Sequence, residues 1–419
     1  MKSVIAASVL ALMTSASAYA TSIDADIGQF AMGVQKALNK IDDAKKVTST
    51  GQEAVNAANL VSKVNAGDLT AVYQTSKVGQ TAENKIESYK YYSLTVEDVT
   101  QDATNVANSI SIGEVTNGVA LGEAEQLEKI KQRSYGDQFS MNKIEELDFG
   151  KNIGQTAVNA ANLVTLEVDG GVIDDISQKS KGDQTALNKI YTGWFDTADL
   201  HMVKQSATNV ANSISLGEID VEDVASNINK MLDDVEQEVR VDQYAENKIE
   251  VGNIVEDVAQ EAVNAANLIS SEKVGLGEVY QVAYGNQDAL NTIKFKYKID
   301  GNATTLAGVL IPATQDATNV INSVSAAVIS KTLSQYSDVD QKAENVADSV
   351  SGYSEVWDLN QTAVNAANLV SIGTIGGDLE LDQVAYVSQN ASNLIDANGM
   401  VDKVVQSATN VANSVGDLN

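Results

Sequence analysis

The sequence predicts an all-β fold, a β-solenoid of stacked β-arches built from about sixteen degenerate repeats. Three observations predict it: the phrase Q-x-A-x-N recurs along the chain, its constant residues are spaced two apart, and two of them are amides. The ten residues QTAVNAANLV, for example, occur unchanged at 155–164 and at 361–370. Repetition of this kind indicates a scaffold of stacked units, each of which buries its inner face against its neighbours.

The copies fall into two classes that alternate without a break. Positions are counted from the glutamine of the phrase as 0. In the odd class a second glutamine lies at −6, as Gln178 does before Gln184, and isoleucine lies at +6 in seven of eight copies. In the even class a second asparagine lies at +7, as Asn162 does after Gln155, and a β-branched aliphatic residue lies at +9. One repeat region, residues 21–419, is expected, with four blocks that begin near residues 29, 132, 237 and 335.

The spacing of two places Gln, Ala and Asn on one face of a strand. The positions between them vary and often carry charge, which is typical of a solvated face, so the constant face is expected to point inward. A buried amide without a partner costs a few kcal/mol, whereas identical amides stacked ~4.8 Å apart can donate and accept along a column. The expected structural amide ladder consists of Gln35, Asn39, Gln52, Asn56, Asn59, Gln80, Asn84, Gln101, Asn105, Asn108, Gln138, Asn142, Gln155, Asn159, Asn162, Gln184, Asn188, Gln205, Asn209, Asn212, Gln243, Asn247, Gln260, Asn264, Asn267, Gln287, Asn291, Gln315, Asn319, Asn322, Gln341, Asn345, Gln361, Asn365, Asn368, Gln389, Asn393, Gln406, Asn410 and Asn413.

In the even class the residues at +7 and +9 have the opposite parity from the phrase. One continuous strand cannot point both sets inward, so a bend or bulge is expected between +4 and +7. Strand, bend and strand then form one β-arch. Segments between copies, such as Ser88 to Asp98, are expected as external loops. The alternation favours one odd and one even copy in each turn of the solenoid. A solenoid with a single copy in each turn is the alternative.

A helical repeat is the alternative, because positions 0, +4 and +7 also share a helix face. Against it, Asn, Ser, Thr and Gly are poor helix formers. Runs such as LTVEDV (94–99) are also typical of strands. The sequence therefore favours strands.

Composition restricts the location and the partners. A net charge of −29 argues against nucleic-acid binding, which needs clustered Lys and Arg. Residues 1–20 have the features of a secretory signal peptide: Lys2, an apolar stretch at 4–13, and Ala18-Tyr19-Ala20 before the cleavage point. No later segment is long and apolar enough to insert into a membrane. There is no cysteine, so disulfides cannot stabilise the fold.

The odd class, Q-x5-Q-x-A-x-N, resembles the curlin repeat of bacterial curli fibres, S-x5-Q-x-G-x-N-x-A-x3-Q. The residues in register with that pattern are Gln178, Gln184, Ala186 and Asn188 in an odd copy, and Gln155, Ala157, Asn159 and Ala161 in an even copy. Gln stands in place of Ser, Ala in place of Gly, and the trailing Gln is missing. The resemblance implies a subunit of an amyloid-like, biofilm-type fibre outside a Gram-negative-type bacterium. It also implies an outer-membrane secretion pore, and copies of itself or other fibre subunits as partners.

The sequence offers no catalytic site. His201 is the one histidine, and no phosphate loop, H-E-x-x-H or G-x-S-x-G motif occurs. The pairs Asp174-Asp175 and Asp233-Asp234 are expected to be solvated, because adjacent strand residues face opposite sides. No metal or cofactor is expected; calcium is the one ion that scattered carboxylates could hold, and neither an EF-hand loop nor a tandem Gly/Asp nonapeptide is present.

Two features outside the repeat phrase remain open. The aromatics Trp194-Phe195 and Tyr89, Tyr91 and Tyr92 lie between copies, where they either grip a surface or glycan or cover the solenoid. The run from Lys294 to Asp300 is a basic strand that either meets an acidic neighbouring subunit or forms a solvated edge.

We therefore expect a secreted structural protein, not an enzyme. It would be a component of an extracellular amyloid-like fibre or biofilm matrix, self-assembling by strand addition at open solenoid ends. The alternative is a cell-surface adhesin or anchor in which a monomeric solenoid presents binding loops. Neither function involves nucleic acid or membrane insertion.

Overall fold

The computed structural model describes residues 26–64, 71–88, 94–116, 127–169, 173–192, 198–217, 231–250, 253–301, 303–304, 310–350, 352–375 and 379–417. Every regular element in these residues is a strand, so the prediction of an all-β protein is confirmed and the helical alternative is wrong for this part of the chain. The expected signal peptide, Trp194-Phe195, and Tyr89, Tyr91 and Tyr92 lie outside the described residues. Within them, no helix is long and apolar enough to cross a membrane.

The strands form two series, one for each class of repeat copy. Three long strands, β6, β12 and β16, carry one copy of each class and so run from one series into the other. The odd series consists of β1 (Ile27–Ile41), β3 (Ala71–Glu87), β5 (Leu127–Ser134), the first part of β6 (Gln138–Asp169), β7 (Ile173–Lys181), β8 (Gln184–Thr192), β10 (Met231–Arg240), β11 (Gln243–Glu250), the second parts of β12 (Ile254–Phe295) and β16 (Ala313–Ser349), and β19 (Glu380–Asp396).

The even series consists of β2 (Lys46–Val64), β4 (Leu94–Thr116), the second part of β6, β9 (Asp199–Leu216), the first parts of β12 and β16, β13 (Lys298–Asp300), β17 (Glu355–Trp357), β18 (Leu359–Ile375), β20 (Val401–Asp402), β21 (Val405–Val411) and β22 (Ser414–Asp417). Two further short strands, β14 (Ala303–Thr304) and β15 (Leu310–Ile311), form a separate antiparallel pair.

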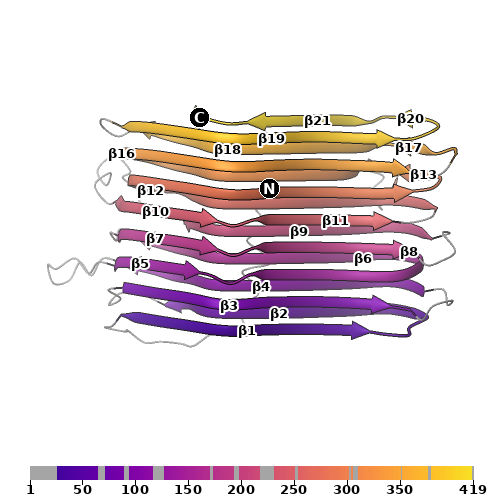
Figure 1. Cartoon of the computed structure of the whole chain (residues 1–419), viewed down its shortest axis with the longest axis horizontal. Coiled ribbons are helices and arrows are strands. Elements are labelled where there is room, and N and C mark those ends of the chain that lie inside the picture. Colours follow the sequence, from indigo (N-terminus) through magenta and orange to yellow (C-terminus); the bar gives the residue numbers. More distant parts are fainter. Residues whose placement is uncertain are drawn as a thin grey trace.

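Within each series the strands pair in parallel and like residues stand beside like. Gln35 pairs with Gln80 and Asn39 with Asn84 between β1 and β3, and the same register continues up the series. Twenty strands join into one continuous sheet in this way. Figure 1 shows the strands stacked in chain order, from β1 at the bottom to β21 at the top, with their long axes aligned.

The two series face each other across a narrow interior. Its centre is a column of fully buried alanines at +2 that come from both classes, for example Ala245 and Ala262. Two aliphatic clusters flank this column. One contains the odd-class isoleucines at +6, such as Ile249, and the other contains the even-class aliphatics at +9, such as Ile269. The small side chain of alanine lets the two series approach closely, and the aliphatic clusters supply most of the apolar burial.

The bend of the even class lies at +7, on the second asparagine itself, and not between +4 and +7 as the sequence predicted. Asn267 has a φ of 52°, and its equivalents from Asn59 to Asn368 have values between 51° and 56°. A left-handed residue in a strand reverses the parity of the residues after it. Asparagine adopts this conformation more readily than other side chains do, which explains why the position is never glutamine.

A second bend, for which the repeat spacing gave no prediction, lies at −3 of the even class. Positive φ values occur there at Ser49, Asp98, Asn152, Met202, Asp257, Asp358 and Lys403. The remaining even copy, at Gln315, has Pro312 at this position, whose ring holds φ near −65°. The sequence feature that indicates this bend is the frequency of Asp and Asn three residues before the phrase.

One expectation for a segment between copies is wrong, and one of the two alternatives for another segment is excluded. Leu94 to Asp98 belongs to strand β4 and not to an external loop, because Leu94 and Val96 are fully buried in an aliphatic cluster. The run from Lys294 to Asp300 is not a solvated edge strand. It divides between the end of β12 and β13, and β13 pairs with β12 on one side and with β17 on the other.

Candidate functional site: the amide columns and the terminal edges

Three columns of asparagine run the length of the stack. They consist of the odd-class residues at +4 and the even-class residues at +4 and +7. In every column Nδ2 of each asparagine donates to Oδ1 of its equivalent in the next copy of the same class, at 2.8–3.0 Å. The donors of all three columns therefore point toward the C-terminal end of the stack.

Three columns of glutamine run beside them with the opposite polarity. In these columns Nε2 donates to Oε1 of the preceding copy, at 2.6–2.9 Å. Gln243, for example, donates to Gln184 and accepts from Gln287. The glutamine donors therefore point toward the N-terminal end.

The structure places every residue of the expected ladder in five of these columns. The sixth column, the odd-class glutamines at −6, was not included in that ladder. It consists of Gln29, Gln74, Gln132, Gln178, Gln237, Gln281, Gln335 and Gln383. The signal was present, because the constant spacing of six residues puts both glutamines of an odd copy on the same face of a strand.

Most amide nitrogens also donate across the interior to a backbone carbonyl of the opposite series. Gln243 Nε2 donates to Ala265 O at 3.1 Å, and Asn247 Nδ2 donates to Glu261 O at 2.7 Å. A carbonyl oxygen only accepts, so it requires the nitrogen and not the oxygen of each amide to face it. These bonds tie the two series together and, in the copies between the two terminal layers, satisfy amide side chains that are at most 2% exposed.

One irregular copy has a hydrogen-bonded hydroxyl in place of the inward alanine. Ser140 replaces the alanine of the copy at Gln138 and is fully buried. Its hydroxyl donates to Val158 O at 2.8 Å, lies 2.8 Å from Asn159 Oδ1, and accepts from Asn105 Nδ2 at 3.0 Å. The polar replacement is therefore fully satisfied.

The two ends of the stack are sheet edges. Within the described residues β1 and β2 pair only with β3 and β4, and β19, β21 and β22 pair only with β16 and β18. Large apolar side chains are exposed on the outer faces of these terminal strands. They are Phe30, Met32, Val34 and Leu38 on β1, Tyr386 and Leu394 on β19 and Val405 on β21. Unpaired backbone groups beside exposed apolar side chains are a template for another strand.

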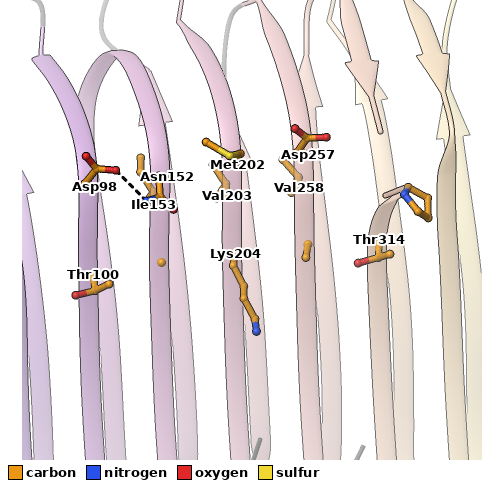
Figure 2. Close-up of a pocket in the computed structure, with 13 residues that line it drawn as sticks. Asp98, Thr100, Asn152, Ile153, Met202, Val203, Lys204, Asp257, Val258 and Thr314 are labelled. Atoms are coloured by element: carbon orange, nitrogen blue, oxygen red, sulfur yellow. Dashed lines mark hydrogen bonds between the residues drawn. The ribbon is translucent and has the colours of Figure 1, made fainter. Parts of the chain in front are cut away.

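A shallow groove of about 580 Å³ runs along the outer face of the even series. Figure 2 shows its lining residues on successive strands: Asp98, Asn152, Met202 and Asp257 lie at the second bend, and Lys204 lies below them. Asn152 Nδ2 donates to Asp98 Oδ1 at 2.9 Å. The lining side chains differ from copy to copy and contain no nucleophile beside a base, so the groove offers contact area and no catalytic arrangement.

The remaining polar candidates lie on the outer surface. His201 lies in β9, where Nδ1 is 2.7 Å from Glu256 Oε2 and the ring packs at 5.8 Å from Phe149. Asp175 contacts Lys129, and Lys331 pairs with Asp233 at 3.2 Å. Among the described residues no group of three or more His, Cys, Asp or Glu side chains is placed to hold a metal ion.

Comparison with known proteins adds no family. No family model, no curated protein and no solved structure matches the chain.

Proposed function

We propose that the chain is a secreted structural protein that assembles with other copies of itself into an amyloid-like extracellular fibre. The observation that carries this proposal is the one-sided pairing of β1 with β3 and of β19 with β16. Each end of the stack has the strand direction, register and side-chain amides that another layer of the same kind would need. A sheet edge of this kind adds a strand from a partner by main-chain hydrogen bonds.

We further propose that the two series are the two faces of one β-solenoid of stacked β-arches. Each turn would contain one odd and one even copy, since odd strands pair with odd and even with even. Eight turns at ~4.8 Å would span about 38 Å. The side-chain columns would fix the register, because a slip of one residue places glutamine opposite an outward side chain. The acidic outer face, part of a net charge of −29, would slow premature assembly.

The test is assembly of the purified mature chain, followed by thioflavin fluorescence and fibre diffraction. Reflections at ~4.8 Å along the fibre and at ~10 Å across it are expected. The double variant Phe30→Lys, Met32→Lys places charge on the exposed face of β1 and should lengthen the lag of assembly at least about tenfold, since edge lysines oppose strand addition.

A matched control is Tyr73→Lys, Tyr280→Lys, which makes the same change on β3 and β12, two strands that are paired on both sides. It should assemble like the parent. If the parent chain stays monomeric and gives no ~4.8 Å reflection, the fibre proposal fails.

A further inference from the structure

The opposite polarities of the asparagine and glutamine columns make the two ends of the stack chemically different. At the β1–β2 end, Asn39, Asn56 and Asn59 are the first members of their columns. Within the described residues, no side-chain amide donates to their Oδ1 atoms. At the same end the glutamines have no preceding Oε1 and donate only across the interior, as Gln35 Nε2 does to Ala57 O at 3.0 Å. This end therefore offers asparagine acceptors and glutamine donors.

The β19–β21–β22 end offers the complementary groups. In the part of the chain that the structure describes, Oε1 of Gln383, Gln389 and Gln406 accepts from no following glutamine. Asn393 Nδ2 donates to Ser407 O at 2.7 Å, and no asparagine follows it in its column. The other two asparagine columns end at Asn410 and Asn413, which likewise donate only to a backbone carbonyl. This end therefore offers glutamine acceptors and asparagine donors.

We propose that the contact between two copies is polar: the C-terminal end of one copy, β19 with β21 and β22, docks on β1 and β2 of the next. This inference rests on the proposed function and specifies which surfaces meet. In this orientation all six columns continue across the junction, donor to acceptor. At a junction of two N-terminal ends the asparagine columns would present only acceptors to one another and the glutamine columns only donors. At a junction of two C-terminal ends the reverse would hold, so neither junction lets a column continue into one of its own kind, which leaves buried amides unpaired.

The outer faces of the two ends agree with this docking. Alignment of Gln29 with Gln383, as the column requires, brings Phe30 beside Val384 and Met32 beside Tyr386. Phe30 is 63% exposed, Met32 74% and Tyr386 63%. Cross-strand pairs of aromatic and aliphatic side chains stabilise a sheet, so the junction would cover the exposed apolar side chains at both ends.

The charge of the two ends also differs in sign. Residues 26–64 contain five lysines and four carboxylates, whereas residues 379–417 contain one lysine and five carboxylates. In a chain with a net charge of −29 the first segment is slightly positive and the last is clearly negative. Unlike ends therefore attract, and two C-terminal ends repel each other.

Cysteine cross-linking tests both direction and register, because the native chain has no cysteine. Lys36 and Asn390 are exposed and follow the aligned glutamines Gln35 and Gln389. Lys36→Cys protein mixed with Asn390→Cys protein under oxidising conditions should give mainly the mixed dimer. The register control replaces Asn390→Cys with Ser392→Cys, which moves the thiol about 6.6 Å along the strand. The Cα atoms would then lie beyond the span of a disulfide, so the yield should fall about tenfold.

The outcomes separate this inference from the proposed function. Homodimers of Lys36→Cys or of Asn390→Cys as the main product would overturn the polar junction, even if fibres form. Equal yields with Ser392→Cys, or fibres that give no cross-link, would overturn the register. If each variant has the circular dichroism spectrum of the parent, and is therefore folded, but none assembles, the fibre proposal itself fails.

Discussion

Asn264 and Asn319 lie 55 residues apart in the sequence and are joined by a single hydrogen bond of 2.9 Å from Nδ2 to Oδ1. Asn264 also donates to Asp288 O at 2.7 Å and accepts from Asn209 at 2.9 Å. One side chain thus connects three even copies and the facing odd strand. The interior is held by many such equivalent groups, and among the described residues no charged side chain is buried in it, which makes a single isosteric substitution informative.

Asn264→Asp should destabilise the protein by about 3–5 kcal/mol at pH 7. The new carboxylate would place an oxygen against two acceptors, Asn319 Oδ1 and Asp288 O, and would leave a buried charge unpaired. The measurement is the free energy of unfolding in urea. Asn390→Asp makes the same chemical change on an exposed outer face and should stay within about 0.5 kcal/mol of the parent. Equal stability of the two variants would contradict the role given to the columns.

The left-handed backbone at the +7 asparagines predicts that glycine and alanine variants differ in stability in opposite directions at +7 and at +4. At Asn267, where φ is 52°, Asn267→Gly should be about 1 kcal/mol more stable than Asn267→Ala, because only alanine bears a Cβ that is strained there. At Asn264, in extended backbone, the order should reverse by about 0.5–1 kcal/mol, because glycine loses more backbone entropy. Both pairs lose the same amide, so each difference isolates the backbone. The same order at both sites would be incompatible with a bend at +7.

Met202→Asn should stabilise the protein by about 1 kcal/mol. Met202 has a φ of 55° and is 43% exposed. Its backbone is therefore strained, and burial of its side chain offsets little of that strain. Asparagine is better tolerated in this region. Thermal or urea unfolding measures the gain, and Lys204→Asn, two residues further along the outer face, should produce none. A loss of stability in Met202→Asn would show that its packing outweighs the backbone strain.

An aspartate at −1 of three successive odd copies predicts a pH dependence. Burial, followed by the charges of Asp137 and Asp242, raises the pKa of Asp183. A carboxyl with a raised pKa binds its proton more readily in the folded state, so its unfavourable contribution is full at pH 7. That contribution is lost as the pH falls through the raised pKa toward the ordinary value of about 3.9.

Asp183→Asn should therefore raise the melting temperature at pH 7 and leave it unchanged near pH 3. Asparagine keeps an acceptor there, and Asn286 already takes the equivalent position in a later odd copy, where its backbone N donates to Asp242 Oδ1 at 2.8 Å. Melting curves of parent and variant at the two pH values make the comparison. A gain of equal size at both would exclude charge repulsion as the cause.

Much of the interior could be read from local sequence. The spacing of two in QTALNKI places Gln184, Ala186 and Asn188 on one strand face, and the structure has all three fully or almost fully buried. The alternation of the two classes indicates that like stacks on like. These inferences succeed for two reasons. The face to which a strand residue points depends only on residue parity, and identical buried amides are stabilised when they stack and bond to one another.

The tertiary structure decided what local pattern leaves open. The direction of each amide column depends on the facing carbonyl, such as Ala265 O for Gln243, and that atom belongs to another strand. The bend at Asn267, the strand that contains Leu94 and the double-sided pairing of β13 likewise follow from contacts across the interior or with the next copy. Residue spacing alone determined which side chains are stacked. The packing of the two series against each other determined which way those side chains point, and with it the difference between the two ends.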